Sequence, residues 1–304
     1  MGWTHANPFV DLPEGGGGVA AVAIDSKDNV WAFQRNPAGK PQLYKFDANH
    51  QLLLTIPEDA IGHQYKPHGM KVDAGDNVWI VDQAAATVKK ISADGKLLMT
   101  IGTAKERGDW NEAKGQRLLW EPVMIDFDAN GDLFVFEGHA NESPNDIEAS
   151  PTNMMGIARV IHLDKNGKFI NQFYGNSTGP GKFYQTHGSA IEPETGNVWI
   201  GDREEYRIVI YDRTGTFIRT ISMRNLVCAL YFDPKGQLWM GTGQDGQIVK
   251  LDRDGRVIGA MGNGPGRGPG QFGESSYMTM DSKGNMYSGD TSNGRITMFS
   301  PPRK

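Results

Sequence analysis

The sequence contains a single cysteine, Cys228, among its 304 residues. One cysteine excludes a disulfide within the chain and cannot build a metal site from thiolates. No apolar run approaches the roughly eighteen residues of a membrane-spanning helix. The first residues, MGWTHANPFVDLP, also lack the charged and apolar regions of a signal peptide. We therefore expect a soluble protein without a membrane partner. Its compartment stays open, and a periplasmic or secreted location after removal of a leader is one of the options.

An excess of positive charge is also missing. Lysine and arginine together number 31 against 36 aspartates and glutamates, which gives a formal net charge of −5 and a pI near 5.8. The basic residues are scattered among the acidic ones. Because nucleic-acid binding proteins carry a clustered basic surface, this composition excludes nucleic acid as the expected partner.

One stretch, residues 67–102, recurs with variations along the chain: PHGMKVDAGDNVWIVDQAAATVKKISADGKLLMTIG. Short segments with alternating apolar residues are separated by turns such as Asp-Ala-Gly-Asp-Asn and Ala-Asp-Gly-Lys. These turns suit tight hairpins, because their residues tolerate positive backbone angles. The stretch therefore predicts four short antiparallel strands.

Six copies of the turn and of the aromatic residue that follows it can be aligned. The aromatic residues lie 40 to 65 positions apart and are Trp31, Trp79, Phe134, Trp199, Trp239 and Tyr287. Four-stranded propeller blades with loops of varied length have this spacing. No linker interrupts the repeats. We predict an all-β fold, a six-bladed β-propeller of four-stranded antiparallel blades in a single domain over residues 1–304.

The last repeat is shorter than the others, because the chain ends at SPPRK after three predicted strands. An unpaired sheet edge is something that natural proteins avoid. The segment NPFVDL precedes the first repeat and is free to fill the gap. The sequence therefore predicts that an N-terminal strand near Phe9 and Val10 closes the ring by pairing with residues 294–299.

The innermost strand of each blade lines the central tunnel, so its first residues converge on the axis. The equivalent positions in the six repeats are Ala20, His68, Val123, His187, Cys228 and Ser276. His68 and His187, in YKPHGM and YQTHGS, thus face the same mouth. Neutral imidazole is a common metal ligand, so this pair predicts a metal site; hydrogen bonds from both histidines to backbone groups are the alternative.

A second aligned set ends the second strand of each repeat and consists of Gln34, Asp82, Glu137, Asp202, Thr242 and Asp290. Repetition at one blade position predicts a structural role, such as accepting hydrogen bonds from backbone N–H groups. Arg35, Arg203 and His139 follow this set at the same rim. They predict a positive pocket that binds a carboxylate or another oxyanion and has a titratable histidine beside it. The alternative is that the arginines only form surface salt bridges.

These motifs resemble NHL repeats, and the whole chain resembles the catalytic core of the peptidyl-α-hydroxyglycine α-amidating lyases. The resemblance implies a zinc site of three histidines, to which PHGM at His68 and THGS at His187 correspond. The third histidine corresponds to Ser276 in GESSYMTMD. The acidic residue that follows it, which assists a structural calcium in the family, corresponds to Tyr277.

The same resemblance implies roles for three residues at the rim. The family arginines that hold the substrate carboxylate correspond to Arg35 in AFQRN and to Arg203 in GDREEYRI. The family's catalytic tyrosine corresponds to His139 in FEGHAN. The missing third histidine and tyrosine separate this chain from the family pattern.

Two functions follow as hypotheses. In the first, the protein is a lyase or hydrolase for a small carboxylate-bearing substrate. His68 and His187 then hold zinc, another divalent metal or a water, His139 is the general base, and Arg35, Arg203 and Tyr277 bind the substrate; a metal-free variant would use the histidines alone as acid and base. In the second, the chain is a non-catalytic NHL propeller that binds a protein or ligand, because fold alone does not fix function. The oligomeric state stays open.

Overall fold

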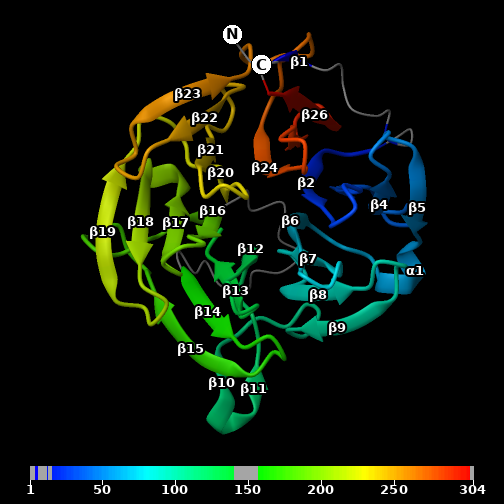
Figure 1. Ribbon diagram of the computed structural model, residues 1–304. Coiled ribbons are helices and arrows are strands. Elements are labelled where there is room, and N and C mark those ends of the chain that lie inside the picture. Colours follow the sequence, from blue (N-terminus) through cyan, green and yellow to red (C-terminus); the bar gives the residue numbers. More distant parts are fainter. Residues whose placement is uncertain (1–3, 6–11, 13–15, 140–156, 302–304) are drawn as a thin grey trace.

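The computed structural model describes residues 4–5, 12, 16–139 and 157–301. It is a ring of six four-stranded antiparallel sheets around a central axis, the predicted β-propeller (Figure 1). In the second blade the strands are Pro67–Val72, Val78–Asp82, Thr87–Ile91 and Leu97–Ile101, as the repeat predicts. Tight turns with positive φ at Asp76, Ala86 and Gly95 connect them.

In the first five blades the strands run in chain order from the axis to the rim. The first three blades are β2–β5 (Val19–Ile24, Val30–Gln34, Leu43–Phe46, Leu52–Ile56), β6–β9 with the bounds above, and β12–β15 (Pro122–Phe127, Leu133–Glu137, Arg159–Leu163, Phe169–Tyr174). The next two are β16–β19 (Thr186–Ile191, Val198–Asp202, Arg207–Tyr211, Phe217–Ser222) and β20–β23 (Ala229–Phe232, Leu238–Gly241, Ile248–Leu251, Val257–Met261).

The sixth blade joins the two ends of the chain. Its strands are β24 (Ser275–Met280), β25 (Met286–Asp290), β26 (Arg295–Ser300) and the N-terminal β1 (Thr4–His5). Thr4 pairs with Ser300 and His5 with Phe299, so an N-terminal strand closes the ring as predicted, but its residues precede the predicted segment NPFVDL. Figure 1 shows β1 beside β26 in this blade. The predicted pairing residues Phe9 and Val10 lie outside the described part of the chain.

The repeated aromatic residues fill the space between neighbouring blades. All six are at most 4% exposed, and each follows a turn whose acidic residue accepts backbone hydrogen bonds. Trp79, for example, packs against Phe127 of the next blade and donates its Nε1 hydrogen to Asp73. Their burial confirms that they form the core rather than an exposed stacking surface.

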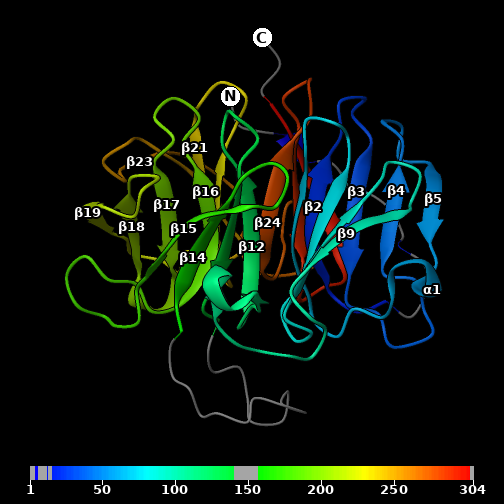
Figure 2. The same ribbon diagram turned by 90° about the horizontal axis from the view of Figure 1, so that it is seen from below.

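Short elements decorate the ring. They are α1 (Glu58–Ile61), the 3-10 turns η1 (Glu112–Lys114) and η2 (Arg203–Glu205), and a small hairpin of β10 (Trp110–Asn111) and β11 (Gln116–Arg117). None of the helices in the described residues is long and apolar enough to cross a membrane. Seen from the side, the inner strands β2, β12, β16 and β24 run nearly parallel to the axis, so their two ends lie at opposite faces of the ring (Figure 2).

Candidate functional site

The first residues of the inner strands leave the regular strand pairing. Between β6 and β7 the register shifts from Pro67 to Met70, and between β16 and β17 it shifts from Thr186 to Ser189. Such irregularities redirect side chains, and they are common next to active sites. His68 and His187 lie within these two shifts and point into the tunnel.

The glycine after each histidine is required by crowding at the axis. A Cβ atom at Gly69 would lie 2.6 Å from the backbone oxygen of Val123, and one at Gly188 would lie 2.2 Å from Cα of Ala229. Neighbouring inner strands therefore approach closely only because these positions lack a side chain. Each His-Gly pair in the sequence thus indicates a histidine on an inner strand that packs tightly against its neighbour.

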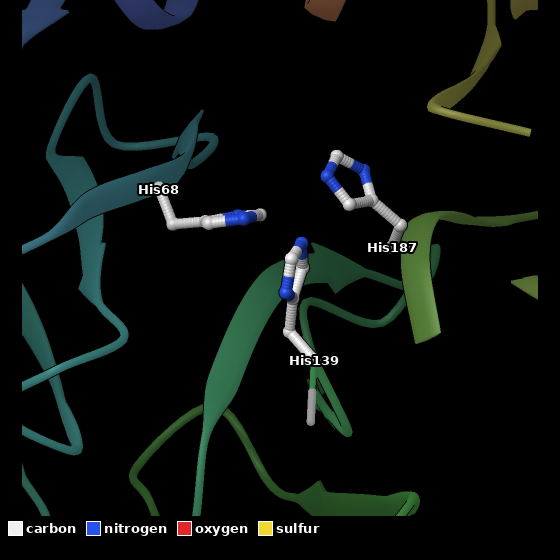
Figure 3. Close-up of side chains that lie close together, drawn as sticks. All are labelled: His68, His139 and His187. Carbon is white, nitrogen blue, oxygen red and sulfur yellow. The ribbon is translucent and has the colours of Figure 1, made fainter. Parts of the chain in front are cut away.

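Three histidines from three consecutive blades meet at this mouth. The centroids of the imidazole rings are 5.0 Å apart for His68 and His187, 5.1 Å for His68 and His139, and 4.9 Å for His139 and His187. One nitrogen from each ring lies within 4.8 Å of the other two. Figure 3 shows the rings facing one another. The convergence predicted for His68 and His187 is present, and His139 joins it.

Backbone carbonyl groups fix two of the three rings. His68 Nδ1 lies 2.8 Å from the oxygen of Val123, and His187 Nδ1 lies 2.6 Å from the oxygen of Cys228. A carbonyl oxygen only accepts, so each Nδ1 carries the hydrogen and each Nε2 keeps its lone pair. The predicted backbone hydrogen bonds therefore exist, and they leave the other nitrogen of each ring available for a metal.

Burial keeps these two imidazoles uncharged. His68 is 2% and His187 is 4% exposed. Burial is the main reason why the pKa of each lies well below the ordinary value of 6.5, and positive neighbours, including Arg35, lower both further. Neutral imidazole is the form that binds metal ions. The donor set therefore fits a divalent metal.

His139 reaches the same centre from the end of β13. Gly138 has a φ of 131°, and it turns the chain away from the strand. A Cβ atom at Gly138 would lie 2.8 Å from Cα of Ala158. The preceding Glu137 is fully buried and pairs with buried Arg159 at 2.5 Å. Because this ion pair joins β13 to β14, it fixes the point at which His139 leaves the sheet.

Tyr277 lies against this centre, and it is 2% exposed. Its hydroxyl oxygen is 2.8 Å from His68 Nδ1 and donates to the Val123 oxygen at 3.0 Å. The phenol therefore supports the orientation of His68. Direct contact between Tyr277 and a substrate stays a prediction.

The two arginines predicted at the rim differ in their partners. Arg35 Nε donates to the oxygen of Pro67 at 3.0 Å, next to His68. Arg203 donates from Nε to Cys228 Sγ at 3.0 Å, and it pairs with Glu204 at 2.7 Å and with Glu274 at 3.0 Å. Both guanidinium groups lie at the histidine mouth, but the charge of Arg203 is balanced by carboxylates. Sequence reasoning did not single out Glu274.

The remaining aligned positions have structural roles. Ser276 Oγ lies 3.4 Å from Thr291 Oγ1. The carboxylates that end the second strands accept backbone N–H hydrogen bonds: Asp82 from Tyr65 and Lys66, Glu137 from Trp120, Asp202 from Tyr184 and Gln185, and Asp290 from Gly273 and Glu274. The structural role predicted for this set is confirmed for its four carboxylates.

The fold and this centre define a class: a six-bladed propeller with three buried histidines and two arginines at one mouth. The chain is 28% identical over 233 residues to mouse peptidyl-glycine alpha-amidating monooxygenase, a match that covers 67% of this chain and 22% of the relative. It is 27% identical over 234 residues to peptidyl-alpha-hydroxyglycine alpha-amidating lyase 1 of Drosophila melanogaster, covering 66% of this chain and 39% of the relative. The chain thus resembles these proteins over less than half of their length.

A gluconolactonase from Xanthomonas campestris has the same fold, with a TM-score of 0.69 and 14% identity over 97% of this chain and 89% of that one. At this identity the likeness concerns the fold alone. No protein-family model matches the chain. The protein is therefore a β-propeller that resembles the amidating lyases in sequence and a gluconolactonase in architecture.

Proposed function

We propose that residues 1–304 form one propeller domain that acts as a metal-assisted lyase or hydrolase on a small carboxylate-bearing substrate, in the manner of the amidating lyases. One observation carries the proposal: His68, His139 and His187 each bring a nitrogen within 4.8 Å of the other two in a buried position. Three protein ligands are the usual number for catalytic zinc, which leaves a position for water or substrate.

His139 supplies the third ligand in this proposal. It takes over the part that the lyase resemblance gives to a histidine at position 276, where this chain has serine. A bound divalent metal would supply Lewis acidity to a substrate oxygen. The carbonyls of Val123 and Cys228 hold the Nδ1 hydrogens, so the chain itself keeps two ligand nitrogens aimed at the centre.

Arg35 binds the substrate carboxylate. Its Nε donates to Pro67, and its position beside His68 directs the rest of the guanidinium to the mouth. Arginine keeps its charge at any working pH and offers a planar pair of donors that matches a carboxylate. An α-hydroxyglycine derivative, the substrate type named for the fly relative, carries such a carboxylate next to a hydroxyl group.

The test combines metal analysis with turnover. Protein purified without chelator should contain about one equivalent of metal at the three histidines. It should act on N-acyl-α-hydroxyglycine or on a carboxylate-bearing ester. Removing the metal with a chelator should abolish turnover, and adding it back should restore it. A chain without metal that still turns over these substrates would favour the metal-free acid and base variant. A chain that binds such carboxylates without turnover would favour the binding module.

A further inference from the structure

A second cluster of possible metal ligands lies in the third blade, on the face of the ring opposite the histidine mouth. Asp128 directly follows β12, whereas His68 and His187 occupy the first residues of their inner strands. Donor atoms of Asp128, Asp132 and His162 lie within 4.8 Å of one another. This cluster shares no residue with the proposed catalytic site, and the inference does not depend on it.

The equivalent corner has the same composition in blades one and two. In blades one and two an aspartate accepts hydrogen bonds from the turn and from an asparagine side chain, and a lysine of the third strand pairs with it at 2.9 Å. The residues are Asp25, Asn29 and Lys45 in the first blade and Asp73, Asn77 and Lys90 in the second. One carboxylate therefore meets one ammonium group.

Blade three departs from this pattern at two positions. The asparagine is replaced by Asp132, and the lysine is replaced by His162. His162 Nε2 lies 3.7 Å from Asp132 Oδ2. Two carboxylates and an imidazole now occupy a corner that holds one carboxylate and one ammonium group in blades one and two. Both replacements introduce metal-ligating groups.

The imidazole of His162 has no hydrogen-bond partner for either nitrogen within the described structure. The residue is 1% exposed, and its ring stacks on Phe134 with centroids 4.0 Å apart. Buried polar groups in native proteins have partners, and an ion is one of the few explanations for an exception.

Arg213, from the fourth blade, now neutralises part of this corner. One of its nitrogens lies 2.9 Å from Asp128 and 3.2 Å from Asp132. Arg253 makes the same kind of contact one blade further on, where it pairs with Glu192 at 2.6 Å. Arg213, however, supplies one positive charge for two carboxylates, and its side chain is 42% exposed. It can turn outward into solvent.

We propose that Asp128, Asp132 and His162 bind a divalent transition-metal ion, such as Zn²⁺ or Co²⁺, which displaces Arg213. Mixed oxygen and imidazole donors suit such ions. Metal bonds of about 2.1 Å in tetrahedral geometry place ligand atoms about 3.4 Å apart, close to the separation of His162 Nε2 and Asp132 Oδ2. Water completes the coordination on the exposed side.

The experiment uses the full chain with His68, His139 and His187 changed to alanine, so that only the second site remains. Titration calorimetry with Co²⁺ or Zn²⁺ should give one equivalent. His162→Lys and Asp132→Asn restore the residues of blades one and two, and each should weaken binding at least tenfold. Arg213→Gln should strengthen binding severalfold, whereas Arg253→Gln, the matched change in the next blade, should leave it unchanged.

Absence of binding even with Arg213→Gln would overturn the proposal. Binding that survives both His162→Lys and Asp132→Asn would overturn it too, because the metal would then sit elsewhere. Should the triple alanine background fail to fold, the same substitutions are made in the unaltered chain. Each of the two must then lower the metal stoichiometry by one equivalent, and an unchanged stoichiometry counts against the site.

Discussion

Arg203 and Glu274 form an ion pair across the histidine mouth, with Nη2 and Oε1 3.0 Å apart. The two residues come from different blades and are 71 positions apart in the chain. Both side chains are largely buried, at 12% and 19% exposure. A charge pair with so little water around it holds its partners more firmly than a surface pair does. Arg203 is therefore less available to a substrate than Arg35.

Glu274→Gln should release Arg203 toward the substrate. With the carboxylate removed, the guanidinium can bind an anionic ligand beside Arg35, and affinity for a small carboxylate should rise about five- to tenfold, corresponding to about 1 kcal/mol for a charge-assisted hydrogen bond. Calorimetric titration measures this change. Glu204→Gln is the control, because that carboxylate is 44% exposed and its pair contributes little. Equal affinities in all three proteins would show that neither pair restrains Arg203.

The repeat made the fold predictable. Six turn and aromatic signatures gave the blade number, and the short last repeat gave closure by the N-terminus, since both follow from local patterns in the chain. The convergence of His68 and His187 was predictable for the same reason. Equivalent positions in a ring of repeats must face one mouth.

The rest of the site depends on contacts that no local pattern encodes. The aligned repeats predict His139 at the same rim, but only the turn at Gly138 brings its ring level with the other histidines. The placement of Tyr277 against His68 joins residues 209 positions apart. Glu274, the partner of Arg203, belongs to a Gly-rich connection between two blades. The sequence of this connection predicts a loop but does not predict the contact with Arg203. These details come from tertiary packing, so periodicity could not reveal them.

Gly188→Ala should damage both stability and the metal centre. The added methyl group would lie 2.2 Å from Cα of Ala229, so the backbone must shift beside His187. Overpacking of this kind costs about 1–3 kcal/mol. We expect a lower melting temperature and weaker metal binding. Gly179→Ala is the control, because its nearest neighbour would be 3.7 Å away and its φ is not left-handed. An unchanged melting temperature for Gly188→Ala would show that the inner strands can separate without cost.

Asp73 should contribute to acid sensitivity. Burial alone would raise its pKa, but hydrogen bonds from Trp79, Lys90 and Asn77 outweigh burial, and the net pKa is lowered. Because the folded pKa lies below the unfolded value of about 3.9, the stabilisation is complete above that pH and is lost as the pH falls through the folded pKa.

Denaturant unfolding at several pH values tests this assignment. The stability difference between the unaltered chain and Asp73→Asn should be constant above about pH 5 and should shrink below about pH 4. Asp94→Asn serves as the control, because Asp94 is 62% exposed and its pair with Lys96 is screened by solvent. A difference for Asp73→Asn that stays constant down to pH 3 would refute the assignment.

His139→Ala tests whether His139 is a metal ligand or a general base. In either role His139→Ala should lower turnover by about 10²- to 10⁴-fold. If His139 is the third ligand, the variant should also lose metal affinity by at least tenfold, because two imidazoles with water bind less tightly than three. If it is only a base, metal content should be retained while turnover falls. Metal analysis and steady-state kinetics on one preparation separate the two.

His63→Ala, which removes a half-buried histidine paired with Glu58, is the control and should change neither quantity. Our proposal requires the joint loss of metal and turnover, and full metal content with unchanged turnover would remove His139 from the mechanism.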